Sequence, residues 1–218
     1  MQTETADDSA LPLLSTVEAR ILGCLVEKQA TTPEAYPLTA NAAVLACNQK
    51  TSREPLMELE SGEVGHALRE MEQRGLVRSI HGARAQRYEH RFAQAYSLTA
   101  RQVAVLALLL LRGPQTLAEL HTRSERLSDF ADVDELRQTL ERLMQRSPTC
   151  VVKLERAPGQ REDRYMHLLC GAVDASQYVF ANKTAPAAEQ NDLSARLDAL
   201  EAEVAALRAA LDELRASR

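Results

Sequence analysis

The residues best suited to chemistry in this sequence are arginines, and they are concentrated in one segment. Between Arg74 and Arg91 the chain carries five arginines and a single acid, Glu89. The whole chain is acidic, with 26 Lys and Arg against 31 Asp and Glu and a formal net charge of −5. Because a guanidinium matches the geometry of phosphate oxygens, this pattern predicts phosphate contact by a local patch and excludes attraction by a global basic field.

Other reactive sites have little support in the sequence. No C-x-x-C, H-E-x-x-H or H-x-x-x-H pattern occurs, so we predict no metal and no cofactor. There is also no Gly-rich phosphate loop and no G-x-S-x-G motif, so we predict a binding protein and not an enzyme. Four cysteines lie singly in or beside apolar runs and are expected to be buried, reduced thiols: Cys24, Cys47, Cys150 and Cys170.

The arginine-rich segment includes a motif that occurs twice. GARAQRYEH at 82–90 returns as GQREDRYMH at 159–167, and LSTVEARILGCLVEK from Leu14 aligns with LTARQVAVLALLLLR from Leu98. After this first amphipathic helix, each copy continues with a shorter helix, a longer helix and two short strands around a turn. The distance between the copies predicts two domains of one kind. The tyrosines of the motif are expected to pack inward and its arginines to face solvent.

Three helices followed by a hairpin is the element order of a winged helix-turn-helix. In that domain the third helix can enter the DNA major groove and the hairpin, or wing, can lie along the backbone. We therefore predict an α+β, mostly helical chain of two tandem winged helix-turn-helix domains followed by a C-terminal coiled-coil helix. The predicted parts are a disordered tail at 1–13, domain 1 at 14–96, domain 2 at 97–173, a linker at 174–192 and the coiled coil at 193–218.

The third helix of the first copy is expected to present polar side chains that can contact base edges. Its predicted buried stripe is Val64, Ala67, Leu68 and Met71. Together with the wing arginines, this face predicts a regulator that binds double-stranded DNA. The predicted DNA-binding residues are His66, Arg69, Gln73, Arg78, Arg84 and Arg87.

The third helix of the second copy is more acidic on its outer face. It presents Asp134 and Glu141, which repel phosphate, so domain 2 is expected to contact a subunit or a protein partner. An alternative stays open for both domains, namely that they are protein-interaction modules without nucleic acid. The predicted buried residues of this helix are Val133, Leu136, Leu140 and Leu143.

The segment after the second helix of the first copy is too long for an ordinary helix-turn-helix turn. Long ordered loops in compact domains are often functional, so its polar half is a candidate site. Both charged residues of that half are expected to be exposed and dispensable for stability. The candidate residues are Asn48, Gln49, Lys50, Ser52 and Arg53. The apolar residues expected to cap the core instead are Leu56, Met57 and Leu59.

The C-terminal segment carries a seam of apolar residues at alternating spacings of four and three. This is the a/d pattern of a coiled coil, and the flanking charges suit a parallel pair, so we predict a homodimer. The alternative is that this helix packs on its own chain. The seam residues predicted to dimerise are Leu193, Leu197, Leu200, Val204, Leu207, Leu211 and Leu214.

Location and family follow from longer stretches. The longest apolar run, Val103–Leu111, is too short to span a bilayer, and the polar N-terminus lacks the features of a signal peptide, so we expect a cytoplasmic protein and no membrane contact.

The stretches VEKQATTPEAYPLTANAAVLACNQKTSREPLM, LLLRGPQT and REDRYMHL resemble the bacterial YceH-like family from Leu14 to the C-terminus. The resemblance implies a tandem pair of winged helices. It supplies no activity, because the function of that family is uncharacterised.

Overall fold

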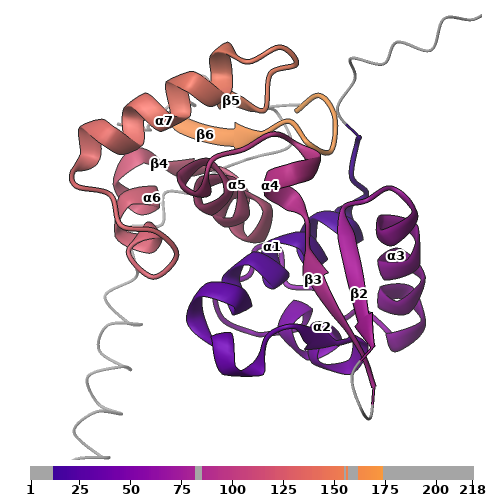
Figure 1. Cartoon of the computed structure of the whole chain (residues 1–218). Coiled ribbons are helices and arrows are strands. Elements are labelled where there is room, and N and C mark those ends of the chain that lie inside the picture. Colours follow the sequence, from indigo (N-terminus) through magenta and orange to yellow (C-terminus); the bar gives the residue numbers. More distant parts are fainter. Residues whose placement is uncertain (1–11, 82–84, 155, 157–161, 174–218) are drawn as a thin grey trace, which may run out of the picture. The chain divides into compact units, whose positions relative to one another are not determined.

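The computed structural model describes residues 12–81, 85–154, 156 and 162–173 (Figure 1). The chain divides into two units, Met1–Gln177 and Tyr178–Arg218, and every described residue belongs to the first unit. Within the described part the protein is α+β, with seven α-helices and two three-stranded antiparallel sheets. The predicted wing residue Arg84, most of the N-terminal tail, the linker and the coiled-coil seam lie outside the described residues, so the dimer stays a prediction.

The first copy of the repeat begins with a long helix and ends with a hairpin. Its order is α1 (Thr16–Thr31), the 3-10 turn η1 (Pro33–Ala35), β1 (Leu38–Thr39), α2 (Ala40–Cys47), α3 (Ser61–Gln73), β2 (Val77–His81) and β3 (Gln86–His90). The strand order is β1-β3-β2, so Tyr88 on β3 lies opposite Leu38 on one side and Ser79 on the other.

The second copy has the same order and the same sheet topology. The short helix α4 (Phe92–Ala95) leads into α5 (Ala100–Arg112), β4 (Gln115–Thr116), α6 (Leu117–Ser124), α7 (Val133–Gln145), β5 (Val151–Leu154) and β6 (Arg164–His167). The strand order β4-β6-β5 places Tyr165 between Gln115 and Lys153, as Tyr88 is placed in the first copy. The predicted order of three helices and a hairpin is found in both copies. The short strands β1 and β4 were not predicted.

Side-chain caps fix where the first helix of each copy begins. Ser15 Oγ accepts a hydrogen bond from Glu18 N at 3.2 Å, and Glu18 Oε2 accepts one from Ser15 N at 2.8 Å. Thr99 and Gln102 make the same reciprocal pair before α5. These capping boxes satisfy amide groups that have no partner inside the helix. The predicted Ser or Thr cap is confirmed in both copies.

Helices α1 and α5 pack directly against each other (Figure 1). α5 is apolar on all sides and is buried from Gln102 to Leu111, as expected for a helix that other elements surround. Gly23 in the middle of α1 permits the close approach, because a Cβ there would lie 2.8 Å from Leu111 Cγ and 3.3 Å from Leu110 Cβ. The first helices of the two copies therefore form a shared layer.

One continuous hydrophobic core results from this packing. It includes fully buried residues of both third helices, such as Leu68 on α3 and Leu140 on α7, together with Ile21 on α1 and Leu106 on α5. The predicted stripes of α3 are buried as expected, and the motif tyrosines Tyr88 and Tyr165 point inward, as the repeat predicted. Neither copy has a core of its own that is separate from the other.

The glycine at the helix contact gives a paired test of this packing. We expect Gly23→Ala to destabilise the protein by about 1–3 kcal/mol, because the new methyl group requires Leu111 to move. Gly65→Ala on α3 is the matched control. Its Cβ would meet only Arg69 Nη1 at 3.7 Å, so we expect a gain of about 0.5–1 kcal/mol from helix propensity. Urea unfolding followed by circular dichroism measures both. Equal effects of the two substitutions would show that α1 and α5 are not in tight contact.

Candidate functional site

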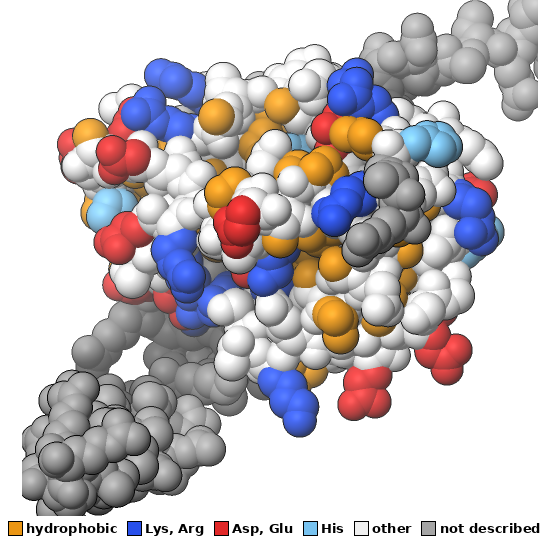
Figure 2. Space-filling view, turned by 60° about the horizontal axis from the view of Figure 1, so that its bottom comes forward, with side chains coloured by type: hydrophobic (Ala, Val, Ile, Leu, Met, Phe, Trp, Pro, Cys, Tyr) orange, Lys and Arg blue, Asp and Glu red, His pale blue; other side chains and the backbone are white. Residues whose placement is uncertain are grey.

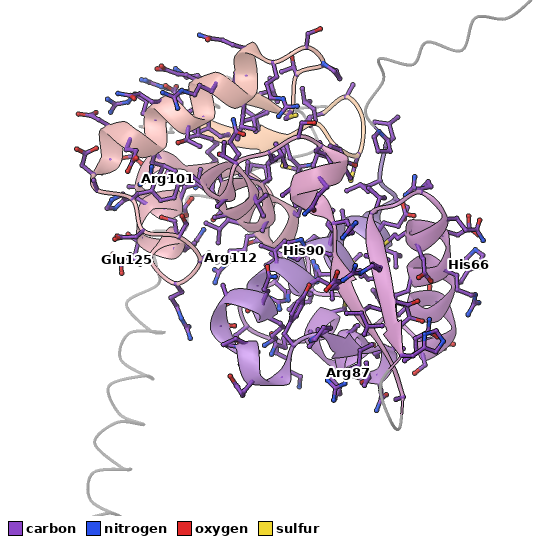
Figure 3. All side chains as sticks on the ribbon, in the orientation of Figure 1. His66, Arg87, His90, Arg101, Arg112 and Glu125 are labelled. Carbon is purple, nitrogen blue, oxygen red and sulfur yellow. The ribbon has the colours of Figure 1, made fainter. Side chains whose placement is uncertain are left out.

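The predicted DNA-contacting residues of α3 are all exposed, and they lie on one side of the helix. Arg69 stands three residues after His66 and four before Gln73, so the three side chains are neighbours on the helix surface. His66 lies on the side turned away from the hairpin (Figure 3). Gln73 is seven residues, or two helical turns, further along and shares the side of His66.

The predicted DNA-contacting arginines of the hairpin lie on another surface. Arg78 pairs with Glu89 at 2.7 Å, and Arg87 Nη1 donates a hydrogen bond to the carbonyl of Pro37 at 2.7 Å. Successive side chains of a strand point to opposite faces, so Arg87 and Glu89 lie on the face opposite the buried Tyr88. The structure thus places the described DNA-binding candidates on two surfaces, the outer side of α3 and the outer face of the hairpin.

The repeated motif serves the fold in both copies. Arg164 Nη1 donates to the carbonyl of Pro114 at 3.0 Å, which is the counterpart of the bond from Arg87 to the proline before β1. The histidines that end the motif are both largely enclosed, and burial lowers the pKa of His90 and of His167 to about 4. Arg87 is exposed, as the repeat predicted, whereas Arg164 is only partly exposed, and both tie the return strand of their hairpin to a neighbouring turn.

The loop between α2 and α3 is held by a buried arginine. Arg53 forms an ion pair with Glu27 at 2.6 Å, donates from Nε to the carbonyl of Ala46 at 3.0 Å and donates from Nη2 to Gln49 Oε1 at 2.8 Å. Only 6% of Arg53 is exposed. The prediction that this arginine is an exposed site residue is wrong, because its guanidinium is used inside the molecule.

A second buried arginine joins the same loop to α1. Arg20 donates from Nη1 to the carbonyl of Cys47 at 3.2 Å and from Nη2 to the carbonyl of Pro55 at 2.6 Å. Burial lowers the pKa of Arg20, which still stays charged at neutral pH. Glu54, the residue before Pro55, donates its backbone N–H to the carbonyl of Leu111 at 2.8 Å. The loop thereby connects the first copy to the end of α5.

The remaining loop residues divide between structure and solvent. The Asn48 side chain both donates to and accepts from the backbone of Leu59, at 2.9 Å in each direction. Lys50 and Ser52 are exposed and remain available to a ligand. Leu56 is 63% exposed, so the expectation that it caps the core is wrong, whereas Leu59 does pack against the core.

The clearest concave site lies in the second copy. A groove of about 560 Å³ is bounded by α7, the start of α6 and the hairpin β5–β6. One stripe of α7 lines it, and its apolar members are Val133 at one end and Met144 at the other. Leu117 from α6 and Tyr165 from β6 add further apolar surface.

The basic side chains of the groove are already paired. Asp163 contacts Arg156 at 2.6 Å and Lys153 at 2.7 Å, and these two partners lower the pKa of Asp163 to about 2. Arg137 pairs with the neighbouring acid of α7, three residues before it. Glu141 also lines the groove, and neither it nor Glu162 forms an ion pair within the part of the chain that the structure describes.

Sequence reasoning missed this groove because it placed Val133 in the core. Val133 is 37% exposed, whereas the other three residues of the predicted stripe, Leu136, Leu140 and Leu143, are fully buried. The signal was nevertheless present. Val133 and Met144 stand at helical spacing with Arg137 and Glu141, forming a second stripe beside the buried one.

Other site types find no support among the described residues. None of them form a group of three or more His, Cys, Asp or Glu that could hold a metal ion. No described helix is long and apolar enough to cross a membrane. Cys24, Cys47 and Cys150 are buried free thiols as predicted, but Cys170 is exposed, contrary to expectation.

These observations define an α+β protein built from a duplicated unit of three helices and a hairpin. Residues 14–160 match a family model described as "Protein of unknown function, DUF480". A UPF0502 protein of Mesorhizobium japonicum is 56% identical over 204 residues, which cover 94% of this chain and 97% of the relative. A UPF0502 protein of Stenotrophomonas maltophilia is 56% identical over 217 residues, 98% and 99% of the two chains. A Xanthomonas campestris relative is 55% identical over 210 residues, 94% of each chain.

The chain belongs to the DUF480 family, and the three relatives above are UPF0502 proteins. The expected membership of an uncharacterised bacterial family is confirmed, whereas the name YceH and the tandem winged helices that it implies stay predictions.

The two charged residues of the loop are predicted to differ sharply in their effect on stability. We expect Arg53→Ala to cost about 3–5 kcal/mol of the free energy of unfolding, because it leaves Glu27 without its partner and opens a buried site. Lys50→Ala is the matched control and should change stability within about 0.5 kcal/mol, since its side chain is exposed. Chemical denaturation measures both. A small effect of Arg53→Ala would contradict this account and would mean that Arg53 is an exposed residue that is not needed for stability.

Proposed function

We propose that this protein is a cytoplasmic, non-enzymatic adaptor of two winged-helix domains that docks a protein partner in the groove of the second domain. The repeated order of three helices and a hairpin, with a short strand pairing onto the returning strand, supports the winged-helix assignment. The observation that carries the proposed function is the contrast between α3 and α7. These helices have equal length and equivalent places in the two copies, but their exposed stripes differ in chemistry.

The two stripes can be compared position by position from the start of each helix. The groove positions of α7 are Val133, Arg137, Glu141 and Met144, and the equivalent positions of α3 are Ser61, Gly65, Arg69 and Glu72. Large apolar side chains thus replace a serine and a glutamate at the two ends of the stripe, and an acid replaces the arginine in between. The second copy therefore has large apolar side chains next to charged ones in its groove, and interfaces between proteins commonly combine the two.

The charges of the groove favour a protein over a nucleic acid. Binding to duplex DNA depends on several unpaired cations that meet successive phosphates. The groove instead pairs Lys153 and Arg156 with Asp163, and it leaves Glu141 without an ion-pair partner among the described residues. On the face drawn in Figure 2, Lys and Arg side chains lie in separate groups among apolar and acidic ones and do not form a single basic field.

DNA binding by the first copy is the second candidate, and one observation favours it. The outer face of α3 is open, since a Cβ at Gly62 would meet nothing within 4 Å, and Arg69 on the same helix is exposed. A duplex could approach this face closely. Two acids, Glu60 and Glu63, stand at the N-terminal end of α3 and would repel phosphate there. This repulsion places DNA second.

The proposed function is tested by photo-crosslinking in the native cells. A photo-reactive amino acid at Val133 should capture one defined protein, and the same group at the equivalent Ser61 is the matched control and should not. Adding the substitution Met144→Glu at the other end of the groove should abolish the adduct, while circular dichroism shows an intact fold.

Fluorescence anisotropy with genomic duplexes at several salt concentrations provides the opposing arm. Three results together would favour the DNA-binding proposal over the adaptor proposal. The protein would bind DNA in a salt-dependent way, Arg69→Ala would weaken this binding while the exposed control Arg142→Ala would not, and position 133 would give no adduct.

A further inference from the structure

We infer that the groove of the second copy accepts an amphipathic helix whose apolar anchor residues are flanked by lysine or arginine. This inference rests on the proposed protein-docking function and specifies the chemistry of the partner. It follows from the length of the apolar stripe, from the pairing of the basic groups and from the charges that remain open.

The stripe on α7 has the length of a helical recognition site. Val133 and Met144 are eleven residues apart, which corresponds to roughly 16 Å at 1.5 Å per residue. An amphipathic helix that lies in a groove commonly presents anchors at positions i, i+3 or i+4, and i+7, which span about 10 Å, so one further anchor at i+11 extends the row to about 16 Å. Leu117 and Tyr165 on the other elements supply apolar surface for such anchors. Three turns of a partner helix therefore match the groove.

Among the described residues, the groove carries two carboxylates outside its ion pairs. Lys153 and Arg156 both contact Asp163, at 2.7 and 2.6 Å, so one carboxylate is shared between these two cations. Glu141 on α7 and Glu162 beside β6 are both exposed lining residues, and neither has an ion-pair partner within the described ranges. Because the two carboxylates come from different elements of the groove, they complement a helix that carries cations on the flanks of its apolar stripe.

The first copy supplies an internal comparison. At the position of Glu141 it carries Arg69, and at the position of Met144 it carries Glu72. A partner helix with cationic flanks would meet Glu141 in the second copy. In the first copy it would meet Arg69 at the equivalent position and be repelled. Specificity for one of two similar domains then follows from a single reversed charge, which both attracts the partner to one copy and repels it from the other.

The test uses three labelled peptides and the full-length protein. Two have the same leucine anchors at helical spacing, one with lysine flanks and one with glutamate flanks, and the third has the lysine composition with its anchors scrambled. We expect the lysine-flanked helix to bind at least tenfold more tightly than either of the others in fluorescence anisotropy. The double substitution Glu141→Lys with Glu162→Lys should reverse the preference in favour of the glutamate-flanked helix. Glu70→Lys, at an exposed acid of α3, is the matched control and should leave the preference unchanged.

Each other outcome overturns the inference. Equal binding of the ordered and scrambled peptides would mean that no helix is recognised. A preference that the charge reversal leaves intact would mean that Glu141 and Glu162 do not select the partner. If no peptide binds but position 133 still captures a protein in cells, the occupant is not a basic amphipathic helix, although the docking function itself survives. Sedimentation is also measured without peptide. If the protein is a dimer that the double substitution dissociates, the occupant of the groove is a second copy of this chain and the inference is wrong.

Discussion

The packing of α1 on α5 is the contact on which the other features depend. Gly23 removes the side chain that would hold the two helices apart, and the apolar surface on all sides of α5 requires that it be enclosed. With both first helices in the centre, the third helix and the hairpin of each copy remain at the surface. The same enclosure explains why one hydrophobic core extends through both copies.

Two buried arginines hold the loop between α2 and α3, which the sequence predicted to be a ligand site. Arg20 and Arg53 hold the loop after α2 through backbone carbonyls and the ion pair with Glu27, and Glu54 connects that loop to Leu111. Removing a charge from water is costly unless paired groups and hydrogen bonds replace the solvent. Arg53, the loop arginine expected to bind a ligand, is therefore used inside the molecule, where it holds the loop in place.

Local features could be predicted from the sequence, and features that depend on distant partners could not. The caps Ser15 and Thr99, the buried stripe of α3 and the repeated order of elements all follow from residues within one helix or hairpin. The burial of Arg53 could not be predicted, because its partner Glu27 is remote in the sequence, and the bond from the exposed Arg87 to Pro37 could not be predicted for the same reason. The sequence predicts Val133 in the core because periodic spacing identifies the apolar side of a helix. The same spacing does not show which of two adjacent stripes on that side is covered by neighbouring elements.

The shared layer of α1 and α5 is most directly tested by native-state hydrogen exchange on the full chain. The slowest amides of α1, around Leu22 to Leu25, should exchange with the same free energy and the same denaturant dependence as those of α5, around Leu106 to Leu109. Both should match global unfolding, because neither helix can leave the core without exposing the other. If α5 stays protected while α1 exchanges through a separate opening of lower free energy, the two copies are independent domains and the account of a single shared core is wrong.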